Sequence, residues 1–164
     1  MSGTYVRANF FDASALVKIY VEEPGSAQVR EYFNNEPTKY TTTFCFYETL
    51  NILKAKWKSQ GRISKQEYLN AAFRLIAWFG HTAEWVRNLE ITEASVLKLA
   101  QDLASRHDLD MSDALQLITV QQGYFSSFGE ESKTIFVTAD KKLARVARDE
   151  GLRVWSVLEE SPPN

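Results

Sequence analysis

The chain alternates short apolar runs with longer stretches in which apolar residues recur every three or four positions. The short runs are rich in β-branched and aromatic residues, and they predict strands at residues 5–11, 39–43, 82–91, 134–138 and 152–157. The periodic stretches predict helices at residues 13–22, 26–33, 44–60, 64–80, 92–105, 111–122 and 140–150. Because strands alternate with helices or helix pairs, we expect an α/β fold, a three-layer α/β/α sandwich with a largely parallel central sheet.

Local signals support two of the helix boundaries. The Pro-Gly pair at 24–25 ends the first helix, because proline cannot continue a helix and glycine ends helices readily. Ser26 is then the expected N-cap of the second helix. Ser64 and Glu67 have the spacing of a capping box, which predicts a helix that begins there.

The composition is that of a folded protein, with 45% hydrophobic and 24% charged residues in 164. This length suits one domain, which we place at residues 1–158, followed by a loose tail at 159–164. The formal net charge is −2, so a nucleic acid would have to be held by a local basic patch or through bound metal. Two groups of cations are candidates: Lys54, Lys56, Lys58, Arg62 and Lys65, and Lys141, Lys142, Arg145 and Arg148.

The single cysteine, Cys45, excludes an internal disulfide and is consistent with a reducing compartment. Its aromatic neighbours predict a buried apolar role rather than a catalytic thiol. No segment has the roughly 20 consecutive apolar residues of a membrane span, and the first residues lack the apolar run of a signal peptide. We therefore expect a soluble cytoplasmic protein with no membrane partner.

Four acidic residues stand where the predicted fold could aim them at one point: Asp12, Glu48, Asp113 and Asp140. In an open α/β sheet, ligands collect at the carboxyl ends of the strands. Converging carboxylates repel one another unless a cation lies between them, and a divalent metal is the usual cation. The alternative is that each acid only caps a helix or faces solvent.

Two hydroxyl residues and two further acids lie near these four in the sequence. Ser14 follows Asp12 closely, and Thr138 ends the predicted strand at 134–138, so both are candidate supporting residues. Asp108 and Asp110 precede the helix that carries Asp113, and either could join the site or serve as a cap.

The four acidic segments together resemble a PIN domain, and most closely the VapC-like toxins of toxin–antitoxin modules. FFDASALVKIYVEEPGS resembles the opening motif of the family, TTTFCFYETLN the second, MSDALQL the third and FVTADKKLARVARDEGLRVW the fourth. The resemblance extends from about residue 9 to residue 157. The loop at 123–133 is longer than the family pattern suggests.

The resemblance implies metal-binding and catalytic roles for Asp12, Glu48, Asp113 and Asp140, with Mg²⁺ or Mn²⁺ as cofactor. It implies a metal-dependent endoribonuclease that hydrolyses RNA phosphodiester bonds, acts as the toxin of a toxin–antitoxin pair, forms a homodimer and binds a cognate antitoxin protein. Two alternatives stay open: a non-catalytic PIN-like module that binds RNA or protein, and a PIN nuclease of RNA processing outside such a system.

Large aromatic residues concentrate in the middle of the chain, and some of them could line a protein-binding groove instead of the core. They are Trp57, Phe73, Trp78, Phe79 and Trp85. Two other enzyme classes fit the sequence less well. A haloacid-dehalogenase-like phosphatase needs a second acid where Ser14 stands, and a nucleotide-binding domain needs a glycine-rich phosphate loop that is not present.

Overall fold

A computed structural model describes residues 7–36, 38–82, 93–122 and 134–164. Four strands form one parallel sheet in the order β2-β1-β3-β4. The strands are β1 (Asn9–Phe11), β2 (Lys39–Tyr40), β3 (Ile135–Thr138) and β4 (Arg153–Ser156). The helices are α1 (Ala13–Tyr20), α2 (Ser26–Asn35), α3 (Thr43–Lys58), α4 (Lys65–Thr82), α5 (Ala94–His107), α6 (Met111–Gln122) and α7 (Lys141–Asp149).

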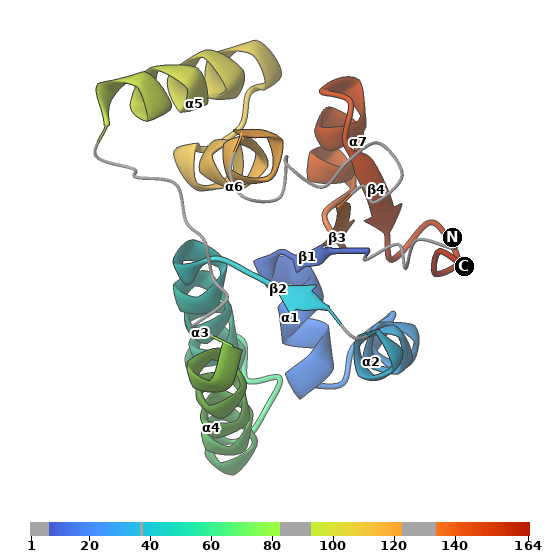
Figure 1. The fold of residues 1–164 in the computed structure, drawn as a ribbon. Coiled ribbons are helices and arrows are strands. Elements are labelled where there is room, and N and C mark those ends of the chain that lie inside the picture. Colours follow the sequence, from blue (N-terminus) through green and yellow to red (C-terminus); the bar gives the residue numbers. More distant parts are fainter. Residues whose placement is uncertain (1–6, 37, 83–92, 123–133) are drawn as a thin grey trace.

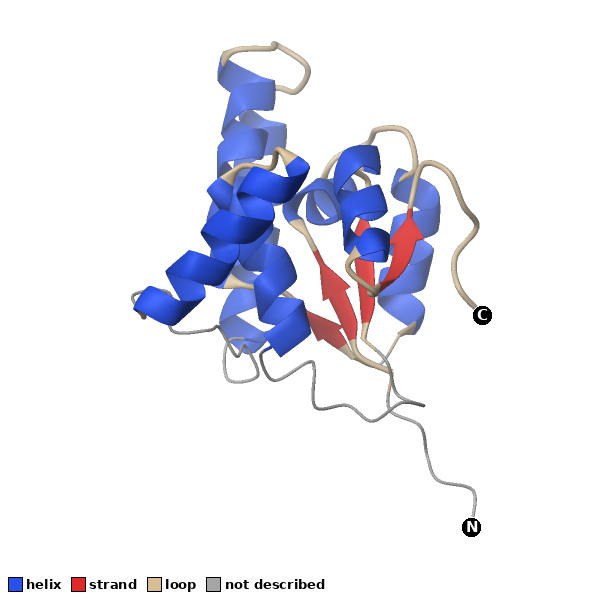
Figure 2. Cartoon of the chain, turned by 90° about the horizontal axis from the view of Figure 1, so that it is seen from above, coloured by secondary structure: helices blue, strands red, loops and turns tan. Residues whose placement is uncertain are grey.

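Helices cover both faces of the sheet, which confirms the predicted three-layer α/β arrangement (Figure 1). The chain moves one way from β1 to β2 and the opposite way from β3 to β4, so right-handed connections place α1 and α2 on one face and α7 on the other. The antiparallel hairpin of α3 and α4 packs beside α1, and α5 packs on α6 (Figure 2). None of the helices in the described ranges is long and apolar enough to cross a membrane.

The two central strands form the core because both of their faces are covered. β1 and β3 are fully buried, as continuous apolar runs in parallel sheets usually are. Phe10 pairs with Phe136 in the register, and their rings stack with centroids 5.7 Å apart. The carboxyl ends of these two strands therefore lie side by side, which is the edge where the sequence predicts a site.

Most helix boundaries agree with the predictions; of the two predicted capping features, one is corrected and one is confirmed. Ser26 is not the N-cap of α2: Gly25 occupies that position in the left-handed region (φ 87°), where a Cβ would lie 3.0 Å from Val157. The Ser26 hydroxyl instead donates to the Val21 carbonyl at 3.0 Å. The Ser64–Glu67 capping box is confirmed, since each side chain bonds to the other's backbone N–H.

The strand predicted at 39–43 is shorter than expected, because the threonines that follow it use their hydroxyls to end it. Thr41 donates to the Phe11 carbonyl at 2.8 Å, and Thr42 caps α3 by accepting from the Cys45 N–H at 3.2 Å. The strand predicted at 82–91 and the loop at 123–133 lie almost wholly outside the described residues, as does Trp85.

A buried ion triad ties α1, the turn after it and α3 together. Glu23 contacts Lys18 at 2.7 Å through one carboxylate oxygen and Lys56 at 2.6 Å through the other. The side chains of Lys18 and Lys56 are only 6% and 10% exposed. Lys56 was expected to belong to an exposed basic cluster on α3, and the structure shows that expectation to be wrong.

Candidate active site

Two of the predicted acids follow the two central strands and begin helices. Asp12 follows β1 and accepts from the Ala15 N–H at 2.9 Å, which caps α1. Asp140 lies two residues after β3 and accepts from the Leu143 N–H at 2.9 Å, which caps α7. Both residues therefore cap helices. Capping uses only one oxygen of each carboxylate, so it leaves a second role open.

Both predicted supporting hydroxyls hold the Asp12 carboxylate. Thr138 donates to Oδ2 of Asp12 at 2.6 Å, and Ser14 lies 2.8 Å from Oδ1 and 3.0 Å from Oδ2. Ser14 also accepts from the Ala139 N–H at 2.8 Å, so this hydroxyl joins the ends of β1 and β3. These contacts fix the orientation of Asp12 before any ligand arrives.

Burial, more than any neighbouring group, determines the ionisation of Asp12. Asp12 is 3% exposed. This burial raises the pKa of its carboxyl group to about 6, although three hydrogen bonds act to lower the pKa. The charge of Glu48 contributes to this rise of the pKa. Among the described residues, no Lys or Arg forms an ion pair with the Asp12 carboxylate.

Glu48 and Asp113 come from two different helices and face the same space. Glu48 lies on α3 and accepts from the Gln116 amide on α6 at 3.2 Å. Burial raises the pKa of Glu48, and the charges of Asp110 and Asp140 raise it further, against hydrogen bonds that act to lower it. Burial, together with neighbouring negative charges, raises the pKa of Asp113 to about 7.

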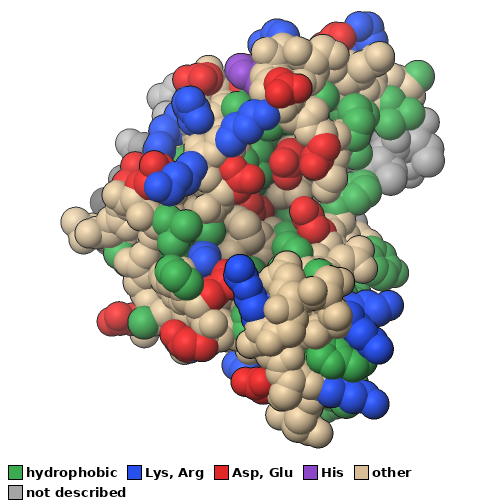
Figure 3. All heavy atoms as spheres, turned by 180° about the vertical axis from the view of Figure 1, so that it is seen from behind, with side chains coloured by type: hydrophobic (Ala, Val, Ile, Leu, Met, Phe, Trp, Pro, Cys, Tyr) green, Lys and Arg blue, Asp and Glu red, His purple; other side chains and the backbone are tan. Residues whose placement is uncertain are grey.

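The four charges that raise the pKa of Asp113 beyond the effect of burial are all carboxylates. They are, in order of effect, Asp110, Glu48, Asp12 and Asp140. The structure therefore brings the four predicted acids and Asp110 into one electrostatic group, which we call the acid cluster. Figure 3 shows acidic side chains gathered around the hollowed middle of one face of the molecule.

The two additional acids of the third motif differ in their placement. Asp110 caps α6 by accepting from the Asp113 N–H at 2.8 Å, and this places its charge in the acid cluster. Asp108 ends α5 in the left-handed conformation, with a fully exposed side chain 3.5 Å from Lys142. Its charge is absent from the main influences on Glu48 and Asp113.

Gln116 is the site residue that the sequence predictions missed. It is 1% exposed. Its Oε1 is the one buried side-chain nitrogen or oxygen atom in the described residues that has no hydrogen-bond partner. Its sequence signal is a polar residue one turn after Asp113 in an otherwise apolar stretch of α6. A buried acceptor without a donor is costly, so this oxygen is suited to a ligand that the protein itself does not supply.

The donor chemistry of the acid cluster fits a hard divalent cation. Its members supply carboxylate oxygens, and Gln116 adds a free amide oxygen, which are the ligand types that Mg²⁺ and Mn²⁺ prefer. As placed, no three His, Cys, Asp or Glu side chains within the described ranges are grouped closely enough to hold an ion. Ligation of one ion by three of these carboxylates would therefore require them to approach one another, whereas Mg²⁺ is usually bound through one or two carboxylates and several waters.

The other candidate groups play structural roles. Cys45 is fully buried, and burial raises the pKa of its thiol to about 12, in agreement with the predicted apolar role. His107 contacts Glu150 at 2.7 Å, away from the acid cluster. His81 is exposed on the last turn of α4.

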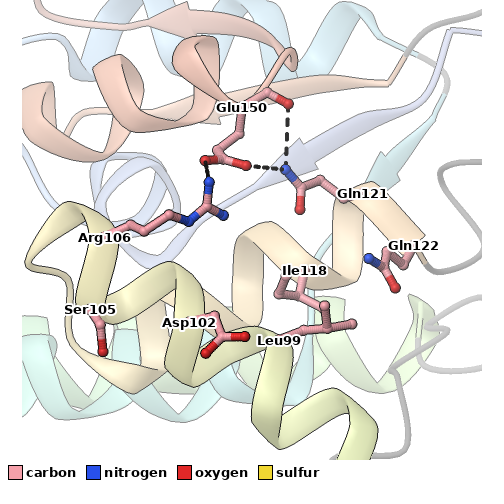
Figure 4. Close-up of a pocket in the computed structure, with 8 residues that line it drawn as sticks. All are labelled: Leu99, Asp102, Ser105, Arg106, Ile118, Gln121, Gln122 and Glu150. Atoms are coloured by element: carbon pink, nitrogen blue, oxygen red, sulfur yellow. Dashed lines mark hydrogen bonds and ion pairs between the residues drawn. The ribbon is translucent and has the colours of Figure 1, made fainter.

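An open pocket of about 600 Å³ lies near the opposite end of α6 from Asp113 (Figure 4). Arg106 contacts Glu150 there at 3.1 Å, and the Gln121 amide lies 3.4 Å from the same carboxylate. The pocket is lined by Leu99, Asp102, Ser105, Arg106, Ile118, Gln121, Gln122 and Glu150. No member of the acid cluster lines it, so the two hollows are separate.

Comparison with known proteins agrees with this arrangement. The crystal structure of PAE2754 from Pyrobaculum aerophilum is similar, with a TM-score of 0.55 and 20% sequence identity, over 93% of this chain and 92% of that one. This likeness concerns the fold. No curated protein matches the sequence. The sequence model of the PIN domain, a family generally made up of nucleases that use divalent metal ions, matches residues 10–149. The order of the strands, the acids at their carboxyl ends and this match lead to one conclusion: the chain belongs to the PIN domain family.

Proposed function

We propose that this protein is a metal-dependent endoribonuclease that hydrolyses RNA phosphodiester bonds. The observation that carries the proposal is the electrostatics of Asp113, whose pKa is raised to about 7 by burial and by four neighbouring carboxylates. A protein does not gain stability from such a group, so the repulsion is explained by a function that requires negative charge at this place.

Asp12, Glu48, Asp113 and Asp140 would hold Mg²⁺ or Mn²⁺ in this site. When bound, such an ion supplies water of lowered pKa and positive charge that stabilises the reacting phosphate. The protein contributes orientation. Ser14 and Thr138 fix the Asp12 carboxylate, and Gln116 positions Glu48 from the facing helix.

RNA cleavage by the purified protein tests the assignment. We expect cleavage of a mixed structured RNA pool with Mg²⁺ or Mn²⁺ and none with chelator. Asp12→Asn should abolish cleavage, because it removes the charge while its amide oxygen can still cap α1. The matched control is Asp102→Asn, which changes an exposed acid paired with Lys98 on α5. Full activity of a folded Asp12→Asn protein would refute the assignment.

We further propose that the nuclease is the toxin of a toxin–antitoxin pair, that it forms a homodimer and that an antitoxin protein covers an apolar surface. The support is an exposed stripe on α4, where Leu69, Phe73 and Ile76 recur at helical spacing and Phe73 is 73% exposed. Arrest of bacterial growth on expression, relieved by Asp12→Asn, is the expected result. Unimpaired growth with an active enzyme would favour a PIN nuclease of RNA processing.

A further inference from the structure

We propose that the outer end of the α3–α4 hairpin binds the phosphate backbone of the RNA substrate. The surface consists of Lys54, Lys58, Arg62 and Lys65, and we call it the hairpin patch. All four side chains are exposed. The inference rests on the proposed function, because it names the surface that would hold the substrate of the acid cluster.

The charges of the hairpin patch are not neutralised by neighbouring acids. Within the described residues, none of its four cations forms an ion pair with a carboxylate. Lys56 on α3, in contrast, forms an ion pair with Glu23. In the second basic group, on α7, three of the four cations are ion-paired, and Arg145 is the exception among the described residues. Lys141 contacts Glu159 at 3.8 Å, and Arg148 contacts Glu160 at 2.5 Å.

Packing between the two helices holds part of the hairpin patch in place. The rings of Trp57 on α3 and Tyr68 on α4 stack with centroids 5.1 Å apart and planes inclined by 18°. The Lys58 ammonium lies 4.6 Å from the centroid of the Trp57 ring, which is a cation–π contact. Lys54 and Lys65 each precede one of these rings by three residues, so they lie one turn away on their helices.

One helix, α3, carries members of both groups: Glu48 of the acid cluster, and Lys54 and Lys58 of the hairpin patch. α3 carries Glu48 near its start and Lys58 at its end, a separation of about 15 Å along the helix axis at about 1.5 Å per residue. Figure 3 shows Lys and Arg side chains over the α3–α4 end, in the same view as the hollow lined by acids. One RNA strand of a few nucleotides can therefore reach both.

The cations of the hairpin patch offset the electrostatic repulsion between this protein and RNA. RNA is a polyanion, and both the acid cluster and the net charge of −2 repel it. Contacts between lysines and phosphates supply most of the affinity of sequence-independent binding, through release of counterions. Unpaired cations beside the cluster offset the repulsion and leave the carboxylates free for metal.

Binding of a labelled single-stranded RNA, followed by fluorescence anisotropy in chelator over a range of salt concentrations, tests the inference without any cleavage. The test variant changes Lys54, Lys58 and Lys65 to Gln. We expect the slope of log affinity against log salt to fall by about 0.7 per lysine, which corresponds to an affinity loss of about 100-fold near 0.1 M salt. The control variant changes Arg30, Lys98 and Arg106 to Gln, which removes the same charge from cations that are ion-paired.

Equal losses in the two variants would overturn the inference, because they would show that total charge alone governs binding. Unchanged RNA binding by the test variant, or equally tight binding of poly-glutamate that displaces RNA, would also overturn it and favour an acidic protein partner. Failure of the proposed function would look different from failure of this inference. Neither the native protein nor the test variant would then cleave RNA with Mn²⁺, and the anisotropy result would still decide whether the hairpin patch binds RNA. If both proposals hold, the test variant cleaves with a raised KM and an unchanged kcat.

Discussion

Replacing Glu23 by Gln should destabilise the protein more than any ordinary surface substitution. Glu23 neutralises the ammonium groups of Lys18 and Lys56 at 2.7 and 2.6 Å, and both lysine side chains are at least nine-tenths buried. Glutamine keeps the shape of the side chain and one acceptor oxygen, yet it leaves two buried positive charges without a negative partner. The Pro24 carbonyl, which accepts from Lys18 at 2.8 Å, compensates only part of one charge.

The magnitude follows from the cost of breaking a buried ion pair. Removal of one partner costs about 3–5 kcal/mol when the other charge stays buried, whereas replacement of a whole buried group by apolar residues is often neutral. Because the Glu23 side chain is 17% exposed and water can reach it, we expect about 3 kcal/mol for Glu23→Gln. In a background that already carries Lys18→Met and Lys56→Met, Glu23→Gln should cost under about 1 kcal/mol of unfolding free energy.

Urea unfolding at pH 7 measures both values, and the two backgrounds form a thermodynamic cycle. Burial alone would raise the pKa of Glu23, but hydrogen bonds and charges from Lys18 and Lys56 lower it below its usual value of 4.5. The stabilisation is therefore complete above pH 4.5 and is lost as the pH falls through the lowered pKa. A cost below about 1 kcal/mol for Glu23→Gln in the native background would refute this account of the triad.

Three further predictions concern the site and its surroundings. In chelator, the protein should unfold at a lower temperature at pH 8 than at pH 5, because the pKa values of Asp12 and Asp113 are raised from 3.8 to about 6 and about 7 and their ionisation disfavours the folded state. Asp113→Asn should reduce this difference in unfolding temperature, and Mn²⁺ should reverse it in the native protein. An unfolding temperature that does not change between pH 5 and pH 8 would contradict the repulsion between these carboxylates. Thr138→Val should cost about 1–3 kcal/mol in urea unfolding and lower cleavage, since Asp12 loses its shortest hydrogen bond, whereas a neutral effect would show that Ser14 alone suffices. Cys45 should resist thiol reagents in the native protein and react on unfolding, so rapid native labelling would contradict its burial.

The sequence predicts the buried parts of the fold best. Residues 134–138 form a continuous apolar run, and the structure places β3 there at Ile135–Thr138. Residues 39–43 are equally rich in β-branched side chains, but only Lys39 and Tyr40 form β2. The difference is chemical, because the Thr41 hydroxyl donates to the Phe11 carbonyl of β1 and the Thr42 hydroxyl caps α3, so side-chain bonds replace further strand pairing.

The sequence predicts the position of a site residue where the order of strands in a parallel sheet determines that position. Asp12 and Asp140 follow strands that a parallel sheet must bring together at one edge. The contact between Glu48 and Gln116 joins residues 68 positions apart on two helices, and no local pattern determines how those helices pack. Lys56 shows the same limit, since its neighbours in the sequence are exposed cations while its partner, Glu23, lies in a distant turn.

The position of β3 at the centre of the sheet has a consequence for how the protein is made. Thr138 bonds to Asp12 across 126 residues, and β1 lacks one of its two neighbouring strands until β3 has emerged from the ribosome. A nascent chain that ends before residue 134 has neither Thr138 nor Asp140, so its first carboxylate is unsupported and its acid cluster is incomplete. Under the proposed ribonuclease function, this order of synthesis would keep the chain from cutting its own message and ribosomal RNA until residues 134–140 have been made and folded.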